Sequence, residues 1–128
     1  MRGSMNRRQQ AEAQGRAAED SAAAHLEDQG WIILARRHRG QRGSGAGELD
    51  LIARTDSTLA FVEVKRRPSP EQALLSLTAR QRRRIETAAE AFLAGHPELA
   101  GLDIRFDLIT LAPAAPPHHL ADAWRVGD

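Results

Sequence analysis

The 128-residue sequence predicts an α/β domain in which a mixed β-sheet is flanked by helices. Three observations lead to this prediction. Residues 9–29 have the composition and spacing of an amphipathic helix, residues 48–66 hold two strand-like segments around a polar turn, and residues 78–111 hold a further helix and strand. The expected order is therefore helix, three strands, helix, strand (α-β-β-β-α-β), and a sheet can cover the apolar face of each helix.

The composition is that of a single globular domain. Hydrophobic residues make up 41% and charged residues 27%, and no apolar run reaches the roughly 18 residues that a membrane span requires. The absence of cysteine excludes disulfides, thiolate nucleophiles and cysteine-based zinc sites. We expect a cytoplasmic protein without membrane contact, with a disordered segment or added leader at 1–8, one domain at 9–112 and a tail without assigned structure at 113–128.

The first helix is predicted over residues 9–29, which are rich in Ala, Glu, Gln and Arg, and Gly30 is suited to end it. The apolar run 31–34 then predicts a short buried strand, which leads into a basic stretch and a glycine-rich loop. That loop lacks the Gly-Lys-Ser/Thr sequence of a nucleotide-binding loop. It is therefore expected to be a flexible connection.

Two segments with the period of a strand follow the loop. Residues 48–53 alternate apolar and polar side chains, residues 59–65 form a second strand, and the polar residues 55–57 between them are suited to a turn. The two segments are predicted to pair as an antiparallel hairpin. Val62 and Val64 are expected to point to one face, and Glu63 and Lys65 to the other.

The second half of the domain is predicted to contain one helix and one strand. Ser76 or Thr78 is expected to cap a helix that runs to Ala94, where Gly95 stops it. Residues 103–111 alternate again and predict a fourth strand. His118 and His119, in the tail, have no third ligand at the spacing of a metal site, so a surface or tail pair is the favoured interpretation.

Asp50, Glu63 and Lys65 form the constellation with the clearest chemical meaning. The hairpin would bring Asp50 and Glu63 to similar heights, and Glu63 and Lys65 project from one face because they are two residues apart. Two converging carboxylates in a sheet repel each other and lose solvation, and a divalent cation removes that cost. The alternatives are an acid paired with arginine at a strand end and an exposed cross-strand charge pattern.

Lys65 is the only lysine among the 18 basic residues of the chain, and all the others are arginine. Because Lys65 lies two residues after a candidate metal ligand, its placement indicates that the site requires a compact ammonium rather than a planar guanidinium. Such a group can orient or deprotonate a water molecule beside a metal ion. The favoured ions are Mg²⁺ and Mn²⁺, because oxygen ligands suit hard cations that keep several waters.

The spacing of Asp50 and Glu63-Val64-Lys65 resembles the motif of the PD-(D/E)XK nuclease superfamily, which includes type II restriction enzymes and archaeal Holliday junction resolvases. The fuller resemblance is to the YraN-like bacterial proteins, and it is carried by residues 47–53, 61–67 and 105–107 within a region from about 15 to 111. It implies a restriction-endonuclease-like core with Asp50, Glu63 and Lys65 as catalytic residues. It also implies Glu19, on the first helix, as a further metal ligand, and Gln81 as a polar catalytic position.

The chain departs from the pattern at two positions, where Leu49 replaces the proline of the superfamily name and Arg80 stands where relatives usually have lysine. Leu49 is common in this branch, whereas any special role of Arg80 is put in doubt. Glu48 shares the predicted face of Asp50. Two interpretations of Glu48 stay open, a support that hydrogen bonds the glycine-rich loop and a solvated acid.

The implied partner is nucleic acid, and DNA is favoured. Although the net charge is only +1, basic residues gather in three clusters that could face phosphates. The residues expected to bind nucleic acid are Arg36, Arg37, Arg39, Arg42, Arg66, Arg67, Arg80 and Arg83. The leading hypothesis is a metal-dependent endonuclease for DNA, including branched or structured DNA. A non-catalytic nucleic-acid-binding module and a protein-interaction domain are the alternatives, and a homodimer is compatible with each.

Overall fold

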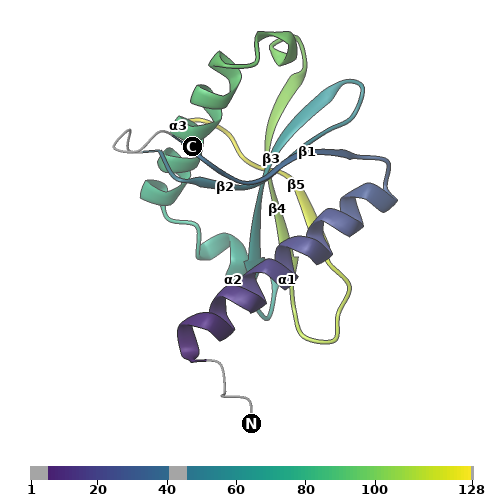
Figure 1. Ribbon diagram of the computed structural model, residues 1–128, viewed down its shortest axis with the longest axis vertical. Helices are drawn as coiled ribbons and strands as arrows, with labels where there is room; N and C mark the ends of the chain where they lie inside the picture. The colour runs from purple at the N-terminus through teal and green to yellow at the C-terminus, as the bar shows by residue number, and fades with distance from the viewer. Residues whose placement is uncertain (1–5, 41–45, 128) are drawn as a thin grey trace.

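The protein is described by a computed structural model that covers residues 6–40 and 46–127 (Figure 1). The elements are α1 (Arg7–Asp28), β1 (Ile32–Arg39), β2 (Glu48–Arg54), β3 (Thr58–Arg66), α2 (Pro70–Leu75), α3 (Ala79–Ala94), the 3-10 turn η1 (Pro97–Leu99), β4 (Asp103–Leu111) and β5 (His118–Trp124). The segment expected as a leader begins outside the described residues, and Arg42 also lies outside them. No helix within the described ranges is both long and apolar enough to cross a membrane.

The five strands form one mixed sheet in the order β1-β2-β3-β4-β5. β1 with β2, β2 with β3, and β4 with β5 are antiparallel, whereas β3 and β4 are parallel. The parallel pair is reached through the connection that holds α2 and α3, since parallel neighbours need a crossover and not a tight turn. The predicted mixed sheet and the β2–β3 hairpin are both confirmed.

The sheet separates two hydrophobic cores, one beneath α1 and one beneath α3 (Figure 1). The α1 core contains Ala22, Ala23, Leu26, Leu51, Ala53, Ala60, Val62 and Ile109. The α3 core is larger, and its members include Ile85, Ala88, Phe92, Leu49, Ile52, Phe61, Phe106 and Trp124. Because small alanines face the sheet along α1, this helix can pack closely against the strands that carry the polar site.

Helix ends follow the capping chemistry of the sequence. Thr78 caps α3 by accepting a hydrogen bond of 3.1 Å from the Gln81 amide. α1 begins at Arg7, two residues before the expected start, because Asn6 and Gln9 form a reciprocal capping box. Gly30 follows α1 with a φ of 91°, a left-handed conformation that favours glycine and ends the helix as predicted.

Three elements extend beyond the predictions. β1 continues past the apolar run through the basic stretch to Arg39, because β2 supplies backbone partners as far as Glu48. The short helix α2, capped by Ser69, precedes α3. β5 lies in the segment expected to be an unassigned tail, and its pairing with β4 makes it the outer strand of the sheet. Trp124, at its end, is buried and stacks on Phe106 with ring centroids 5.2 Å apart.

Asp107 fastens β5 to the sheet. Its fully buried carboxylate accepts hydrogen bonds from Arg105 at 2.7 Å and from the Asp122 amide at 2.9 Å. The same carboxylate contacts Nε2 of His119 at 2.7 Å. Burial alone would raise the pKa of Asp107, but the hydrogen bonds from His119, Arg105 and the Asp122 amide lower it below its ordinary value. His119 is therefore an anchored strand residue, and the interpretation of the two histidines as a surface pair is wrong for it.

Candidate metal centre

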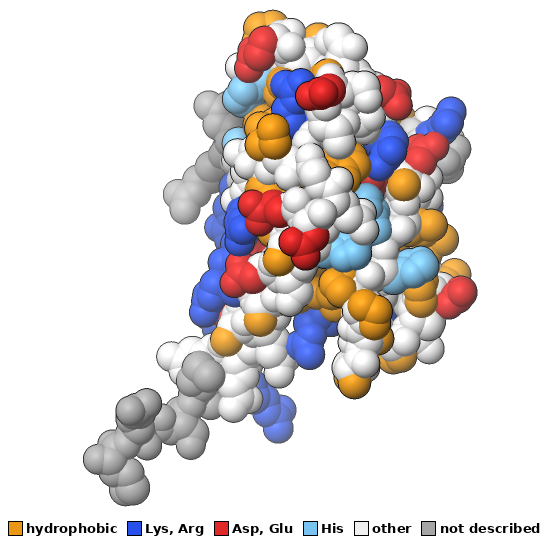
Figure 2. Space-filling model, turned by 90° about the vertical axis from the view of Figure 1, so that its right-hand side faces the viewer, with side chains coloured by type: hydrophobic (Ala, Val, Ile, Leu, Met, Phe, Trp, Pro, Cys, Tyr) orange, Lys and Arg blue, Asp and Glu red, His pale blue; other side chains and the backbone are white. Residues whose placement is uncertain are grey.

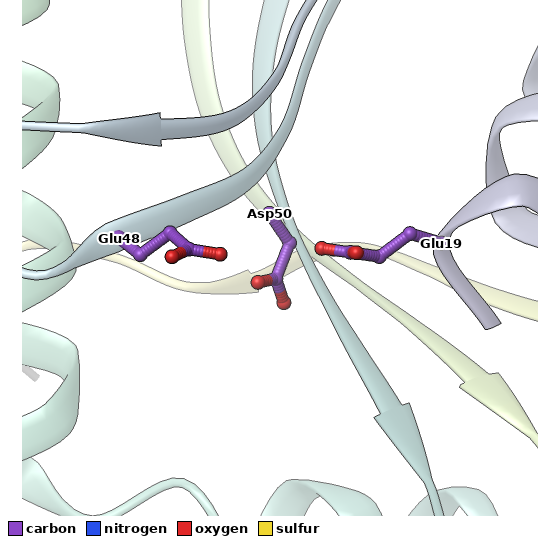
Figure 3. A group of neighbouring side chains, drawn as sticks. All are labelled: Glu19, Glu48 and Asp50. Atoms are coloured by element: carbon purple, nitrogen blue, oxygen red, sulfur yellow. The ribbon is translucent and has the colours of Figure 1, made fainter. Parts of the chain in front are cut away.

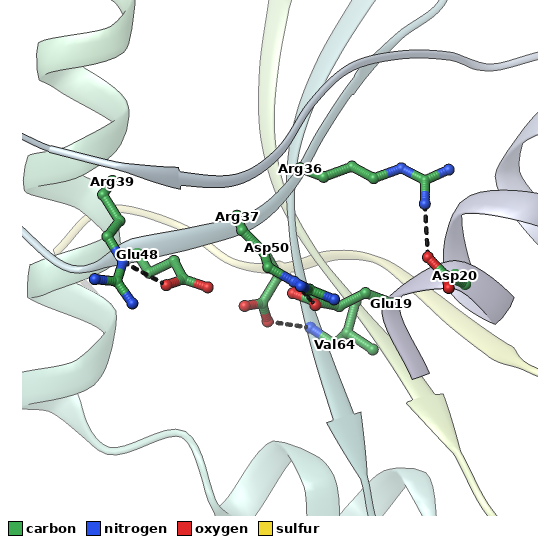
Figure 4. Close-up of polar contacts among 8 residues, drawn as sticks. All are labelled: Glu19, Asp20, Arg36, Arg37, Arg39, Glu48, Asp50 and Val64. Carbon is green, nitrogen blue, oxygen red and sulfur yellow. Dashed lines mark hydrogen bonds and ion pairs between the residues drawn. The ribbon is translucent and has the colours of Figure 1, made fainter. Parts of the chain in front are cut away.

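Asp50 lies where β2 and β3 stop pairing with each other. The β2–β3 ladder ends with Leu51, the residue directly after Asp50, opposite Val62. At that point the Asp50 carboxylate accepts a hydrogen bond of 2.9 Å from the amide of Val64 (Figure 4). Because Asp50 belongs to β2 and its carboxylate bonds to β3, both strands fix the orientation of this side chain.

Two further carboxylates converge on Asp50. Glu19 reaches it from the sheet-facing side of α1, and Glu48 reaches it from the first residue of β2 (Figure 3). One oxygen of each of the three side chains lies within 4.8 Å of the others. We call Glu19, Glu48 and Asp50 the acidic group. Glu19 is only 8% exposed, which is unusual for a glutamate on a surface helix.

Glu63 and Lys65 lie beside the acidic group on β3. Glu63 is buried, and its carboxyl group interacts with that of Asp50 on the neighbouring strand. Nζ of Lys65 is 3.5 Å from Oε1 of Glu63, and the Lys65 side chain is only 15% exposed. The two-residue period of the strand therefore places the ammonium and the carboxylate together, in contact with the aspartate of the neighbouring strand.

Burial gives these carboxyl groups unusual protonation behaviour. Burial raises the pKa of Glu63 to about 8, and the nearby charge of Asp50 adds to the rise, while Lys65 opposes it. Burial also raises the pKa of Asp50 and that of Glu19, although hydrogen bonds from the Val64 amide and from Arg37, respectively, act in the opposite direction. Several buried carboxyl groups with raised pKa values lie together here. Such an arrangement is typical of a site that binds a positive ion.

The donor set fits a hard divalent cation. Mg²⁺ and Mn²⁺ are bound in proteins by carboxylate oxygens together with water. The acidic group supplies three such side chains within reach of one ion, and Glu63 is a fourth carboxyl group beside Asp50. The chain is also free of cysteine, so soft thiolate ligation plays no part. The site can therefore hold a metal ion.

Arginines from β1 are paired with acids of α1 and β2. Arg37 forms an ion pair with Glu19, and Arg39 forms one with Glu48 at 3.0 Å (Figure 4). Arg36, the residue before Arg37, pairs at 2.7 Å with Asp20, which is outside the acidic group. Two carboxylates of the acidic group, Glu19 and Glu48, are therefore already paired with positive charges on β1.

A cleft of about 530 Å³ opens over the acidic group. It contains Asp50, Glu19 and Glu48, and its basic lining residues are Arg16, Arg37, Arg39, Lys65, Arg66 and Arg67. Figure 2 shows basic side chains gathered along one side of the molecule, with acidic side chains among them. The cleft therefore combines carboxylates with basic side chains.

Glu63 and Gln81 meet in a second, smaller cavity of about 140 Å³, which Glu48 also lines. This cavity lies on the α3 side of the site, since Arg84 and Ile85 of α3 complete it. Gln81 therefore lies near a candidate metal ligand rather than at an unrelated place on the helix. Its catalytic role stays a prediction.

The predicted nucleic-acid-binding arginines divide into two sets. Those that line the cleft are Arg37, Arg39, Arg66 and Arg67. Arg36 is paired with Asp20, and Arg80 and Arg83 are exposed on α3, so the structure does not bring these three to the cleft. The sequence analysis did not single out Arg16, whose signal is its place one helical turn before Glu19.

Replacing Glu63 with glutamine is expected to stabilise the metal-free protein. The raised pKa means that the folded state binds a proton more tightly than the unfolded state, so stability falls as pH rises from about 4.5 to about 8. Glu63→Gln removes that loss and should raise the free energy of unfolding by about 1–3 kcal/mol near pH 8. Urea denaturation of both proteins between pH 5 and pH 9 measures this. A variant less stable than the native chain near pH 8 would show that the carboxylate is satisfied without metal.

The comparisons with known proteins support a family relationship across most of the chain. The model of the uncharacterised protein family UPF0102 matches residues 18–111. A UPF0102 protein of Paramagnetospirillum magneticum is 52% identical over 118 residues, covering 92% of each chain. A UPF0102 protein of Azorhizobium caulinodans is 55% identical over 120 residues, which cover 94% of this chain and 88% of that one.

One solved structure gives the fold a counterpart. Hjc of Archaeoglobus fulgidus, a Holliday junction resolvase from an archaeal hyperthermophile, superposes with a TM-score of 0.56 and 19% identity. The match covers 83% of this chain and 75% of that one. At this level of identity the likeness concerns the fold, and the chemistry has to be argued from the site.

Proposed function

The chain belongs to the UPF0102 family, and from the site it carries we propose that it is a metal-dependent endonuclease that hydrolyses phosphodiester bonds of DNA, including branched or otherwise structured DNA. The observation that carries this proposal is the contact between Glu63 and Lys65 beside Asp50, where β2 and β3 stop pairing, with Asp50 and Lys65 lining an arginine-rich cleft. The resolvase-like fold supports the choice of DNA, since Hjc is a Holliday junction resolvase.

In this mechanism Asp50, Glu63 and Glu19 would hold Mg²⁺ or Mn²⁺, with Glu48 close enough to take part. The bound ion would supply a lower pKa for water and positive charge for the phosphoryl oxygens. Lys65 lies in the same cleft and is the group suited to orient the attacking water, because its ammonium has three donors on a flexible stem. Arg66 and Arg67, which follow on the same segment, face the cleft and can hold the DNA backbone.

A non-catalytic nucleic-acid-binding module is the second candidate. The observation in its favour is that Glu19 and Glu48 already have arginine partners, so part of the negative charge is compensated without a metal ion. Such a module would bind DNA through the basic cleft and leave it intact. Its affinity would fall steeply with salt, because each phosphate contact releases counterions.

The test is a cleavage assay on linear, nicked, forked and four-way DNA with Mg²⁺ or Mn²⁺, and with Lys65→Ala as the control. We expect cleavage of at least one substrate by the native chain, and none when the metal is chelated. Salt-dependent DNA binding without cleavage would select the second candidate. No cleavage of any substrate, with the native chain indistinguishable from Lys65→Ala, would contradict the catalytic proposal.

Replacing Asp50 with asparagine is expected to abolish Mn²⁺ binding and cleavage together. The amide keeps the size of the side chain but removes the charge from the centre of the acidic group. Isothermal titration of Mn²⁺ into the native chain and the variant measures the binding step without relying on activity. Equal Mn²⁺ affinity in both proteins would place the metal elsewhere.

A further inference from the structure

We propose that Arg37 and Arg39 are exchangeable counter-ions, which hold the acidic group while no metal ion is bound and transfer to DNA phosphates when one binds. This inference rests on the proposed function and adds a regulatory step to it. The protein would then bind DNA strongly through these two arginines only in its metal-loaded form. The arginines would be positioning residues, with no role in the chemical step itself.

The first observation is the choice of partners. Of the three acids in the acidic group, Glu19 is paired with Arg37 and Glu48 is paired with Arg39. The two arginines are two residues apart on β1, and both line the cleft. The same strand face therefore supplies two positive charges to the carboxylates that the metal ion would need.

The second observation is the backbone of Arg37. Its φ of 49° is in the left-handed region, which non-glycine residues rarely adopt and which costs free energy. Its neighbours Arg36 and His38 pair with Leu51 and Leu49, so Arg37 is held across the β1–β2 ladder from Asp50. Strained backbone kept at a fixed place beside a polar site is typical of a functional constraint.

Competition follows from the chemistry of the carboxylate. A guanidinium and a divalent cation seek the same oxygen lone pairs, and the positive charge of Arg37 also repels an incoming ion. Metal binding would therefore release Arg37 from Glu19 and Arg39 from Glu48. The side chain of Arg37 is 37% exposed and that of Arg39 is 82% exposed, so both can move within the cleft.

Phosphate is the ligand that a released arginine would take. The guanidinium fork matches phosphate oxygens as well as carboxylate oxygens, and a bidentate contact to either has similar geometry. A DNA strand at the metal ion would place a phosphate beside β1. Metal binding and DNA binding would then strengthen each other, and this coupling is reciprocal.

Mn²⁺ affinity of the free protein gives the first arm of the test. At one fixed pH of about 8.5, Arg37→Gln and Arg39→Gln should each bind Mn²⁺ about 5-fold more tightly than the native chain by electron paramagnetic resonance. Arg36→Gln is the matched control, because it breaks an ion pair between β1 and α1 outside the acidic group. Its Mn²⁺ affinity should equal that of the native chain. Arg39→Gln keeps the test valid if Arg37→Gln fails to fold, since Arg39 is largely exposed.

DNA affinity gives the second arm, measured by fluorescence anisotropy against salt concentration in a Lys65→Ala background that prevents cleavage. With saturating Mn²⁺, the double variant Arg37→Gln/Arg39→Gln should lose about 1.4–1.8 from the slope of log affinity against log salt, which corresponds to two phosphate contacts. Without metal the slopes of the double variant and its parent should agree. An equal loss with and without metal, or no loss in either condition, would overturn the proposal.

The two arms separate failure of the exchange from failure of the proposed function. If the native chain binds Mn²⁺ through Asp50, and Arg37→Gln and Arg39→Gln bind it no more tightly, the exchange is wrong and the metal site remains. If the native chain and Asp50→Asn both fail to bind Mn²⁺, the metal site is wrong and the exchange falls with it. Tighter Mn²⁺ binding together with the metal-dependent loss of slope supports both.

Discussion

Replacing Lys65 with arginine is expected to leave the fold intact and to reduce metal-dependent DNA cleavage at least about 100-fold. The charge is unchanged, and the longer guanidinium can extend into the cleft that Lys65 already lines. The chemistry differs, because a guanidinium is planar and effectively never deprotonated, whereas a compact ammonium can lie beside a water molecule at the metal ion. Single-turnover cleavage at saturating Mg²⁺ measures the change.

Arg54→Lys is the matched control for Lys65→Arg, since it exchanges the same two residue types on the neighbouring strand β2, at a side chain that does not line the cleft. Its cleavage rate should stay within a few-fold of that of the native chain. Circular dichroism and urea denaturation should show a stability change within about 1 kcal/mol for both variants. If Lys65→Arg keeps full activity, Lys65 serves only as a positive charge, and the proposal that it orients the attacking water is wrong.

The second large effect concerns stability and lies outside the cleft. Asp107→Ala is expected to lower the free energy of unfolding by about 3–5 kcal/mol, because it leaves Arg105, His119 and the Asp122 amide without the buried carboxylate that joins β4 to β5. Asp103→Ala, on the exposed part of the same strand, is the control and should change stability by about 0.5 kcal/mol or less. Urea denaturation at pH 7 measures both.

The stabilising effect of Asp107 should also depend on pH. Its pKa is lowered in the folded state, so its contribution is present above the ordinary value of about 3.8 and is lost as pH falls through the lowered value. Asp107→Ala should therefore lose less stability than the native chain on acidification below pH 4. Similar stability of Asp107→Ala and Asp103→Ala at pH 7 would show that the carboxylate does not hold β5 in place.

The central residues of the site could be predicted because their geometry is local. The period of a strand places Glu63 and Lys65 on one face whatever surrounds them, and the structure has their side chains in contact. Asp50 required a correct prediction of the hairpin, which the turn residues supplied. Glu19 was different, because an isolated glutamate in an Ala-rich helix has no local signal, and it was inferred from the family resemblance alone.

The features that sequence analysis missed depend on contacts between distant segments. β5 is an outer strand after three prolines, with most of its side chains exposed or only half-buried, and its pairing is supported by contacts with Asp107 of β4. The pairing of Arg37 with Glu19 joins residues 18 apart through the packing of α1 on the sheet. Arg36, Arg37 and Arg39 were expected to face phosphates, and the structure places them on β1, where they also form ion pairs with acids.

The most direct test of the metal centre is the anomalous diffraction of crystals grown with Mn²⁺ and a short DNA. We predict one peak between about 2.0 and 2.6 Å from a carboxylate oxygen of Asp50 and from one of Glu19 or Glu63, with a DNA phosphate beside it. The account would be contradicted if crystals with saturating Mn²⁺ gave no anomalous peak at Asp50 while Arg37 stayed paired with Glu19 and Arg39 with Glu48.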